Sequence, residues 1–148
     1  MADRISIMEG GRIVQADTPV EIYRNPAARF VGSFIGNPPM NFLQASNEGN
    51  GQWKVAGVTL PGPVSDQPTL EFAIRPEDIR TGSGPMEATV RLLEPLGPHL
   101  LLGCRVGDQP FRVIVDSDSP VQIGDTLALD PIPDRIRWFD LDKRNVAA

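Results

Sequence analysis

The sequence predicts a mainly β fold, in which a β-hairpin and two short helices precede an antiparallel barrel. The chain has 148 residues with 14 glycines and 15 prolines, which exceeds ordinary usage, and 41% of its residues are hydrophobic, which suffices for a packed interior. From Met40 onward, short alternating apolar runs recur between turn-forming residues. Short strands joined by turns therefore account for most of the chain.

The first 36 residues are predicted to form the hairpin and the two helices as a separate unit. Residues 4–15 contain two apolar runs that meet at a Gly-Gly turn, as the strands of a hairpin do. Thr18 and Glu21 make a capping box: the hydroxyl accepts a hydrogen bond from a helical N–H, and the carboxylate reaches back. The first helix then runs to about Arg24. A second helix ends at Gly36, which suits a left-handed C-terminal position.

Residues 37–148 are predicted to form the second domain, because Asn37-Pro38-Pro39 suits neither a helix nor a central strand. We expect a single helical turn over residues 75–79 and a loop over residues 82–85. Seven or more short antiparallel strands at this spacing suit an OB-like barrel. The expected strands are residues 41–47, 52–56, 58–60, 70–74, 86–96, 99–106, 110–115, 126–129 and 136–139.

The charge distribution disfavours two classes of partner. The formal net charge is −5. Up to Leu43 four acidic residues balance four basic ones, whereas fifteen acidic residues face ten basic ones from Gln44 onward. Nucleic acid and anionic membrane surfaces are therefore poor partners. No apolar run approaches the length of a membrane span, and the single cysteine, Cys104, fits a reducing cytoplasm.

The sequence offers no catalytic or metal-binding group. His99 is the only histidine and lies beside a Gly-Pro turn, so we expect an exposed turn residue. Cys104 lies in an apolar strand without a neighbouring base, which indicates a small buried thiol. We therefore expect no catalytic residue, metal or cofactor in this chain.

Two further patterns have ordinary structural explanations. The pairs Asp116 with Asp118 and Asp140 with Asp142 are typical of turns, because aspartate hydrogen-bonds to its own backbone there; a calcium site is the alternative. The aromatic residues Trp53, Trp138 and Phe139 could stack on single-stranded nucleic acid in an OB-like barrel. Since the domain is acidic and poor in aromatic residues, we expect these three to pack in the core or at the rim.

Six motifs resemble a known family in their order along the chain. They are Ala2-Asp-Arg-Ile5, Gly10-Gly-Arg-Ile13, Thr18-Pro-Val-Glu-Ile-Tyr23, Arg29-Phe-Val31, Phe34-Ile-Gly36 and Pro39-Met-Asn-Phe-Leu43. This series is similar to the ATP-binding subunits of bacterial ABC importers, where the nucleotide-binding domain passes into the C-terminal regulatory domain. The closest likeness is to the subfamily that serves sugars and glycerol phosphate. Residues 72–79 and 90–97 resemble the regulatory TOBE domain of that subfamily.

The resemblance implies a regulatory module that pairs with a second copy and performs no chemistry itself. The parent subunit would hydrolyse ATP with magnesium on the cytoplasmic side of the inner membrane, together with membrane subunits. The candidate interface residues are Phe30, Phe34, Ile35, Met40, Phe42, Arg75 and Glu77. For Arg75 and Glu77, the alternative to an interface role is a local ion pair.

The chain lacks the phosphate loop G-x-x-x-x-G-K-[ST]. The family's signature loop, catalytic glutamate and switch histidine would lie upstream of Ala2, so we expect a part of a longer protein that does not bind ATP. The alternative function is a sensor of a small ligand, a sugar or an oxyanion. A net charge of −5 makes anions the less favoured ligand.

Overall fold

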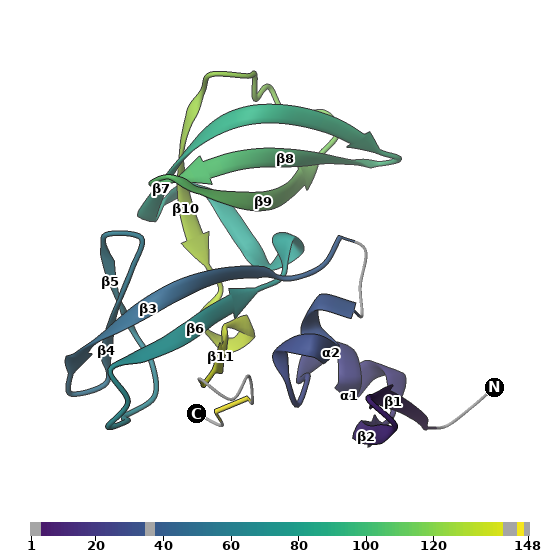
Figure 1. Ribbon diagram of the computed structural model, residues 1–148. Coiled ribbons are helices and arrows are strands. Elements are labelled where there is room, and N and C mark those ends of the chain that lie inside the picture. The colour runs from purple at the N-terminus through teal and green to yellow at the C-terminus, as the bar shows by residue number, and fades with distance from the viewer. Residues whose placement is uncertain (1–3, 35–37, 141–144, 147–148) are drawn as a thin grey trace.

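The computed structural model describes residues 4–34, 38–140 and 145–146, and these residues carry the predicted mainly β fold (Figure 1). Two large antiparallel sheets form the body of the molecule, and a small hairpin with two helices lies beside one of them. The strands of the body are β3 (Asn41–Gly49), β4 (Gln52–Val55), β5 (Val58–Pro61), β6 (Thr69–Ile74), β7 (Ile79–Leu96), β8 (His99–Val106), β9 (Gln109–Asp116), β10 (Thr126–Pro131) and β11 (Arg137–Phe139).

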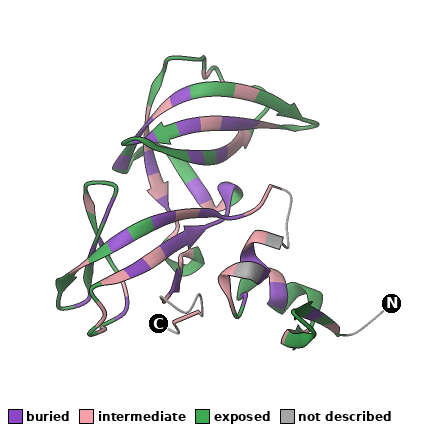
Figure 2. Ribbon diagram, in the orientation of Figure 1, coloured by how far each residue is buried: buried purple, intermediate pink, exposed green. Residues whose placement is uncertain are grey.

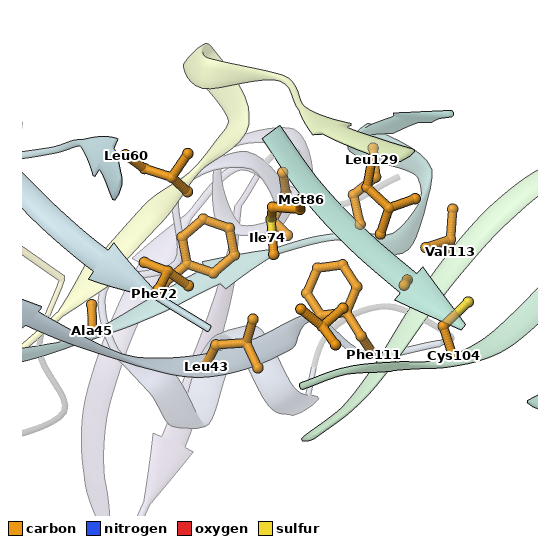
Figure 3. Close-up of a cluster of buried hydrophobic side chains, with 14 of the residues drawn as sticks. Leu43, Ala45, Leu60, Phe72, Ile74, Met86, Cys104, Phe111, Val113 and Leu129 are labelled. Carbon is orange, nitrogen blue, oxygen red and sulfur yellow. The ribbon is translucent and has the colours of Figure 1, made fainter. Parts of the chain in front are cut away.

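The two large sheets share one hydrophobic core. One sheet has the order β11-β6-β3-β4-β5 and the other the order β10-β7-β8-β9. Alternation along the strands turns one face of each sheet inward. Figure 3 shows Leu43, Phe72 and Ile74 of the first sheet gathered with Phe111 and Leu129 of the second. The expected antiparallel architecture is therefore confirmed.

The N-terminal unit consists of β1 (Ile5–Glu9), β2 (Arg12–Asp17), α1 (Pro19–Arg24) and α2 (Arg29–Phe34). Among the described side chains of this unit, Ile7, Ile22 and Val31 form a buried cluster. Of the two hydrogen bonds in the predicted capping box, the structure contains the one accepted by the Thr18 hydroxyl. The Thr18 hydroxyl accepts from the Glu21 N–H at 3.2 Å, whereas the Thr18 N–H donates to Asp17 Oδ1 at 2.9 Å, so Glu21 is not needed there.

The predicted loop at residues 82–85 is wrong, because this segment lies inside β7. On β10, Leu129 pairs with Thr81 of β7, and the preceding residue, Ala128, pairs with Glu87. Because adjacent residues of β10 pair with residues of β7 that are six positions apart, residues 82–86 bulge out of the ladder. Gly84 has φ +141°, and a Cβ there would lie 2.2 Å from the Leu129 carbonyl oxygen. Glycine thus lets the strand pass close to β10 and continue. Two single-turn 3₁₀ helices lie at Pro76–Asp78, as predicted, and at Pro133–Arg135, which was not predicted.

The side chain of Asn41 connects the two large sheets at their edge. β9 is an edge strand, and the buried Asn41 of β3 hydrogen-bonds to the backbone of one of its residues, Arg112. Asn41 Nδ2 donates to the Arg112 carbonyl, and Asn41 Oδ1 accepts from the Arg112 N–H, each at 2.7 Å. The primary amide thus acts as a one-residue strand partner, with one donor and one acceptor facing the same backbone unit.

We predict that Asn41→Leu lowers the free energy of unfolding by about 1–3 kcal/mol, because both Arg112 backbone groups lose their partners while the side-chain volume is kept. Urea unfolding followed by the fluorescence of the buried tryptophans measures this effect. The exposed Gln44→Leu variant on the same strand is the matched control and should change stability by less than about 0.5 kcal/mol. Equal midpoints for the two variants would contradict this role of Asn41.

Candidate functional site

The joint between the N-terminal unit and the five-stranded sheet is the candidate functional site. It is built from polar groups that reach across sequence separations of 42 to 120 residues. β6, β11 and the turn after β6 face α1, α2 and the segment that links these helices (Figure 1). Three arginines and one asparagine carry the contacts.

Arg75 is the most buried charged residue of the joint. It follows β6 directly, and its side chain is 2% exposed. Its Nη2 donates to the Tyr23 carbonyl at 3.1 Å, and its Cζ lies 4.0 Å from the centre of the Tyr23 ring. Burial lowers the pKa of Arg75 to about 10, and the nearby Asp78 carboxylate opposes this shift. The guanidinium therefore remains charged at neutral pH and binds the end of α1.

Arg137 of β11 binds the adjacent carbonyl of the same helix end. Its Nε donates to the Arg24 carbonyl at 2.8 Å, and its Nη1 donates to the carbonyls of Asp134 and Ile136 at 2.8 and 3.0 Å. Burial lowers the pKa of Arg137, and the neighbouring Arg135 lowers it further. The last carbonyls of a helix lack intrahelical partners and carry partial negative charge. Two guanidinium groups from the sheet thus cap α1.

Arg29, the first residue of α2, contacts the other end of the joint. Its Nε lies 2.8 Å from Oε1 of Glu71 on β6. Its Cζ lies 4.2 Å from the centre of the Phe42 ring, and that ring packs against Phe139 with centroids 6.1 Å apart. A half-exposed ion pair contributes little alone, so the aromatic contact gives the pair its fixed position.

The C-terminal segment joins the same site through Asn145. The Asn145 N–H donates to the Ala27 carbonyl at 2.9 Å, and its Nδ2 donates to the Pro26 carbonyl at 2.8 Å. A cleft of about 520 Å³ lies beside these contacts. Its lining residues are Asn25, Ala27, Ile136, Arg137, Trp138, Asn145 and Val146.

The structure places three of the predicted interface residues in this joint. Arg75 and Phe42 make the contacts given above. Met40 is buried with Ala73 and Phe139, and a Cβ added to Gly32 of α2 would lie 2.8 Å from its sulfur. Glu77 instead is exposed, next to Asp78, and partial burial raises its pKa. The side chains of Phe30 and Phe34, and all of Ile35, lie outside the described residues.

Sequence reasoning missed the main partners of these residues, namely Tyr23, Arg137 and Asn145. Nothing local to these positions predicts them, because each contact joins segments more than 50 residues apart. In the local sequence, Pro76 was the one signal that bears on the position of Arg75. It starts the turn after β6 and so aims the preceding Arg75.

His99, Cys104, Trp53 and Trp138 have the structural roles expected from the sequence, whereas Asp142 lies outside the described residues. His99 is exposed at the start of β8, and Cys104 is buried, which raises its thiol pKa to about 11. Trp53 and Trp138 pack in the main core with ring centroids 5.8 Å apart. Within residues 4–34, 38–140 and 145–146, no group of three potential ligand side chains could hold a metal ion. Over the same ranges, no helix is long and apolar enough to span a membrane.

Comparison with known proteins identifies the fold. Residues 72–139 match the family described as the TOBE domain. The chain is 37% identical over 146 residues to the sn-glycerol-3-phosphate import ATP-binding protein UgpC of Jannaschia sp. (strain CCS1), an alignment that covers 97% of this chain and 42% of the relative. The protein of the same name from Vibrio vulnificus (strain YJ016) is 34% identical over 157 residues, with coverages of 99% and 42%.

The TOBE match spans the segment from β6 to β11. Along almost its whole length the chain is similar to these two import ATP-binding proteins. It spans 42% of the length of these two relatives.

We predict that Arg75→Met loosens the N-terminal unit without unfolding the sheets. The variant keeps the apolar stem but removes a charge-assisted hydrogen bond and the stacking on Tyr23, which together are worth about 1.5–3 kcal/mol. Amide exchange in residues 19–34 should then be faster by about tenfold to a hundredfold, while exchange in β8 stays unchanged. Arg80→Met, at an exposed arginine of β7, is the matched control. Unchanged exchange in α1 would contradict the capping role of Arg75.

Proposed function

We propose that this chain is the regulatory and dimerisation part of the ATP-binding subunit of an ABC importer, and that it performs no chemistry itself. The observation that carries the proposal is the joint. Three guanidinium groups, of which that of Arg75 is buried, hold a hairpin-helix unit against the sheet that contains β6 and β11. Such a joint can transmit the position of one unit to the other.

The proposal divides the chain at residues 36 and 37. Residues 1–36 are the end of the nucleotide-binding domain, and residues 37–148 are the regulatory domain. Of the two transported classes, sugars and glycerol phosphate, the relatives' name, an ATP-binding protein for sn-glycerol-3-phosphate import, supports the second. ATP and magnesium then act elsewhere in the whole subunit, which works with membrane subunits at the cytoplasmic face of the inner membrane.

We predict that the chain does not bind ATP. It has no phosphate loop to supply backbone N–H groups and a lysine to the phosphates. Titration calorimetry with Mg-ATP should show only the heat of dilution. A relative that carries the phosphate loop, measured in the same buffer, is the positive control. Saturable heat at micromolar ATP would reject this part of the proposal.

We predict that the chain forms a homodimer, because a regulatory module that tethers two ATP-binding subunits must pair, and closed two-fold pairs are the commonest assembly. Light scattering over a concentration series should give twice the mass of 16.1 kDa at high micromolar concentration. A mass that stays at the monomer value throughout would reject the dimerisation role. It would leave the fold and the joint unaffected.

A small-ligand sensor is the second candidate function, and the cleft beside the joint favours it. Arg137 and the amides of Asn25 and Asn145 line this cleft together with Trp138. This combination of an aromatic ring, amides and a guanidinium suits a sugar or an oxyanion. Calorimetry with glycerol 3-phosphate and with inorganic phosphate distinguishes this function from pure tethering.

A further inference from the structure

The outer edge of β9 has backbone groups that point away from its own sheet. Val106 and Gln109 flank the two-residue turn between β8 and β9, and such a flanking pair is hydrogen-bonded. Because hydrogen-bonded and non-hydrogen-bonded pairs alternate, the N–H and C=O groups of Arg112 and Ile114 point away from β8. The two bonds between Arg112 and the Asn41 side chain agree with this pattern.

The free part of this edge is short and is centred on Ile114. Near the start of β9, Pro110 has no N–H to offer. At the other end, the Ser119 N–H donates to the Asp116 carbonyl at 3.0 Å. Within the part of the chain that the structure describes, the N–H and C=O of Ile114 have no hydrogen-bond partner. Figure 2 shows buried and exposed residues along β9, as expected for a strand with one face on the core.

A groove of about 600 Å³ separates this edge from the start of β7. Residues 79–81 form one wall, and residues 114–116 with 118–120 form the other. A volume of this size lies within the range of binding pockets in proteins. The four-stranded sheet therefore leaves a groove where a closed barrel would have a strand pair.

The wall formed by β7 is a second unpaired strand edge. Residues 79–81 pair with β10 on one side, whereas the pairing of β7 with β8 begins at Thr89. The Ile132 N–H donates to the Asp78 carbonyl at 3.0 Å, so the alternation of bonded pairs turns the backbone groups of Thr81 away from β10. Two strand edges thus face the same groove.

The charge of the groove favours a basic occupant. Asp116 and Asp118 are exposed and line it. Arg80 is the one base among its described lining residues, and it lies directly opposite Asp130 in the β7–β10 pair, which offsets its charge. Arg112 is on the same face of β9 as Asp116 but does not line the groove. The remaining acidic charge favours lysine or arginine in a bound segment.

We propose that this groove binds an extended segment of a partner protein, in which apolar and basic residues alternate. The backbone of the segment pairs with Ile114 of β9 and with Thr81 of β7, and its basic side chains lie near Asp116 and Asp118. In such strand addition, backbone hydrogen bonds supply the affinity and alternate side chains supply the specificity. The proposal goes beyond the proposed function and does not rest on the homodimer.

The first test uses a fluorescein-labelled peptide of about six alternating valine and lysine residues, titrated with the full-length chain and followed by fluorescence anisotropy. We expect saturable binding with a Kd on the order of 100 μM. A peptide of alternating valine and glutamate is the matched control and should bind at least about tenfold more weakly. Equal binding of the two peptides, or no saturation by the lysine peptide, would overturn the proposal.

Amide hydrogen exchange followed by NMR locates the bound peptide. The Ile114 N–H should exchange at least about tenfold more slowly when the lysine peptide is saturating, because it gains a partner. The Val113 N–H, which points toward β8 in the free chain, is the internal control and should change little. Protection that appears elsewhere and not at Ile114 would place the peptide at another site and overturn the proposal.

The second test changes the edge itself. Ile114→Pro removes the outward N–H without removing a bond to β8, and Pro110 already occupies an outward position of the same strand. This variant should bind the lysine peptide at least about tenfold more weakly, whereas Ile114→Val keeps the N–H and should bind within about threefold of the wild type. If Ile114→Pro instead lowers the mass of the chain in solution and leaves peptide binding unchanged, the edge pairs with a second copy and the proposal is wrong.

A charge exchange keeps the test decisive if Ile114→Pro does not fold. Asp116→Lys, at an exposed position, should weaken binding of the lysine peptide and strengthen binding of the glutamate peptide, each by about tenfold. Equal effects on both peptides would mean that the charge of the groove does not select the segment, and would overturn the assigned chemistry of the partner.

Discussion

The paired hydrogen bonds between the Asn41 side chain and the Arg112 backbone are the constraint on which the body of the molecule depends. Each large sheet is a separate hydrogen-bonded unit, yet both contribute to one core. An edge strand such as β9 exposes backbone groups that favour unwanted pairing. Asn41 satisfies one such unit from the other sheet, at 2.7 Å for each bond. The core residues Phe111 and Val113, which flank Arg112, are thereby held at the sheet interface.

The joint resembles the Asn41 contact, because side chains from a distant segment again donate hydrogen bonds to backbone groups that lack other partners. The last carbonyls of α1 face Arg75 and Arg137 rather than water. Arginine suits this role better than lysine, because its planar donors bind a carbonyl while its face stacks on a ring, as Arg75 does on Tyr23. Among its described side chains, the N-terminal unit has a core cluster of three buried apolar residues, Ile7, Ile22 and Val31. The polar contacts of the joint fix the position of this unit on the five-stranded sheet.

Local patterns were enough to predict the strands and the cap of α1, because alternation, turn glycines and Thr18 act within a few residues. The loop at residues 82–85 was predicted wrongly because the prediction also used local patterns alone. Glycine usually ends a strand, and only the close approach of Leu129 shows that Gly84 continues one. The candidate site was predicted in part. Arg75 was predicted from the family resemblance, whereas Arg137 and Asn145 required knowledge of which segments meet in space.

Contacts run without interruption from the joint to the outer face of the four-stranded sheet. Met40 and Phe42 pack in the joint, Asn41 between them binds the Arg112 backbone, and the Arg112 side chain lies on the outward face. Continuity of contacts is necessary for coupling between two surfaces, but coupling also requires an element with two arrangements. The Asn41 amide is the narrowest step along this route, since two hydrogen bonds to one backbone unit cannot both survive a shift of β9 along its axis. A displacement of β9 caused at the outer face would therefore reach the joint by breaking or re-pairing these two bonds.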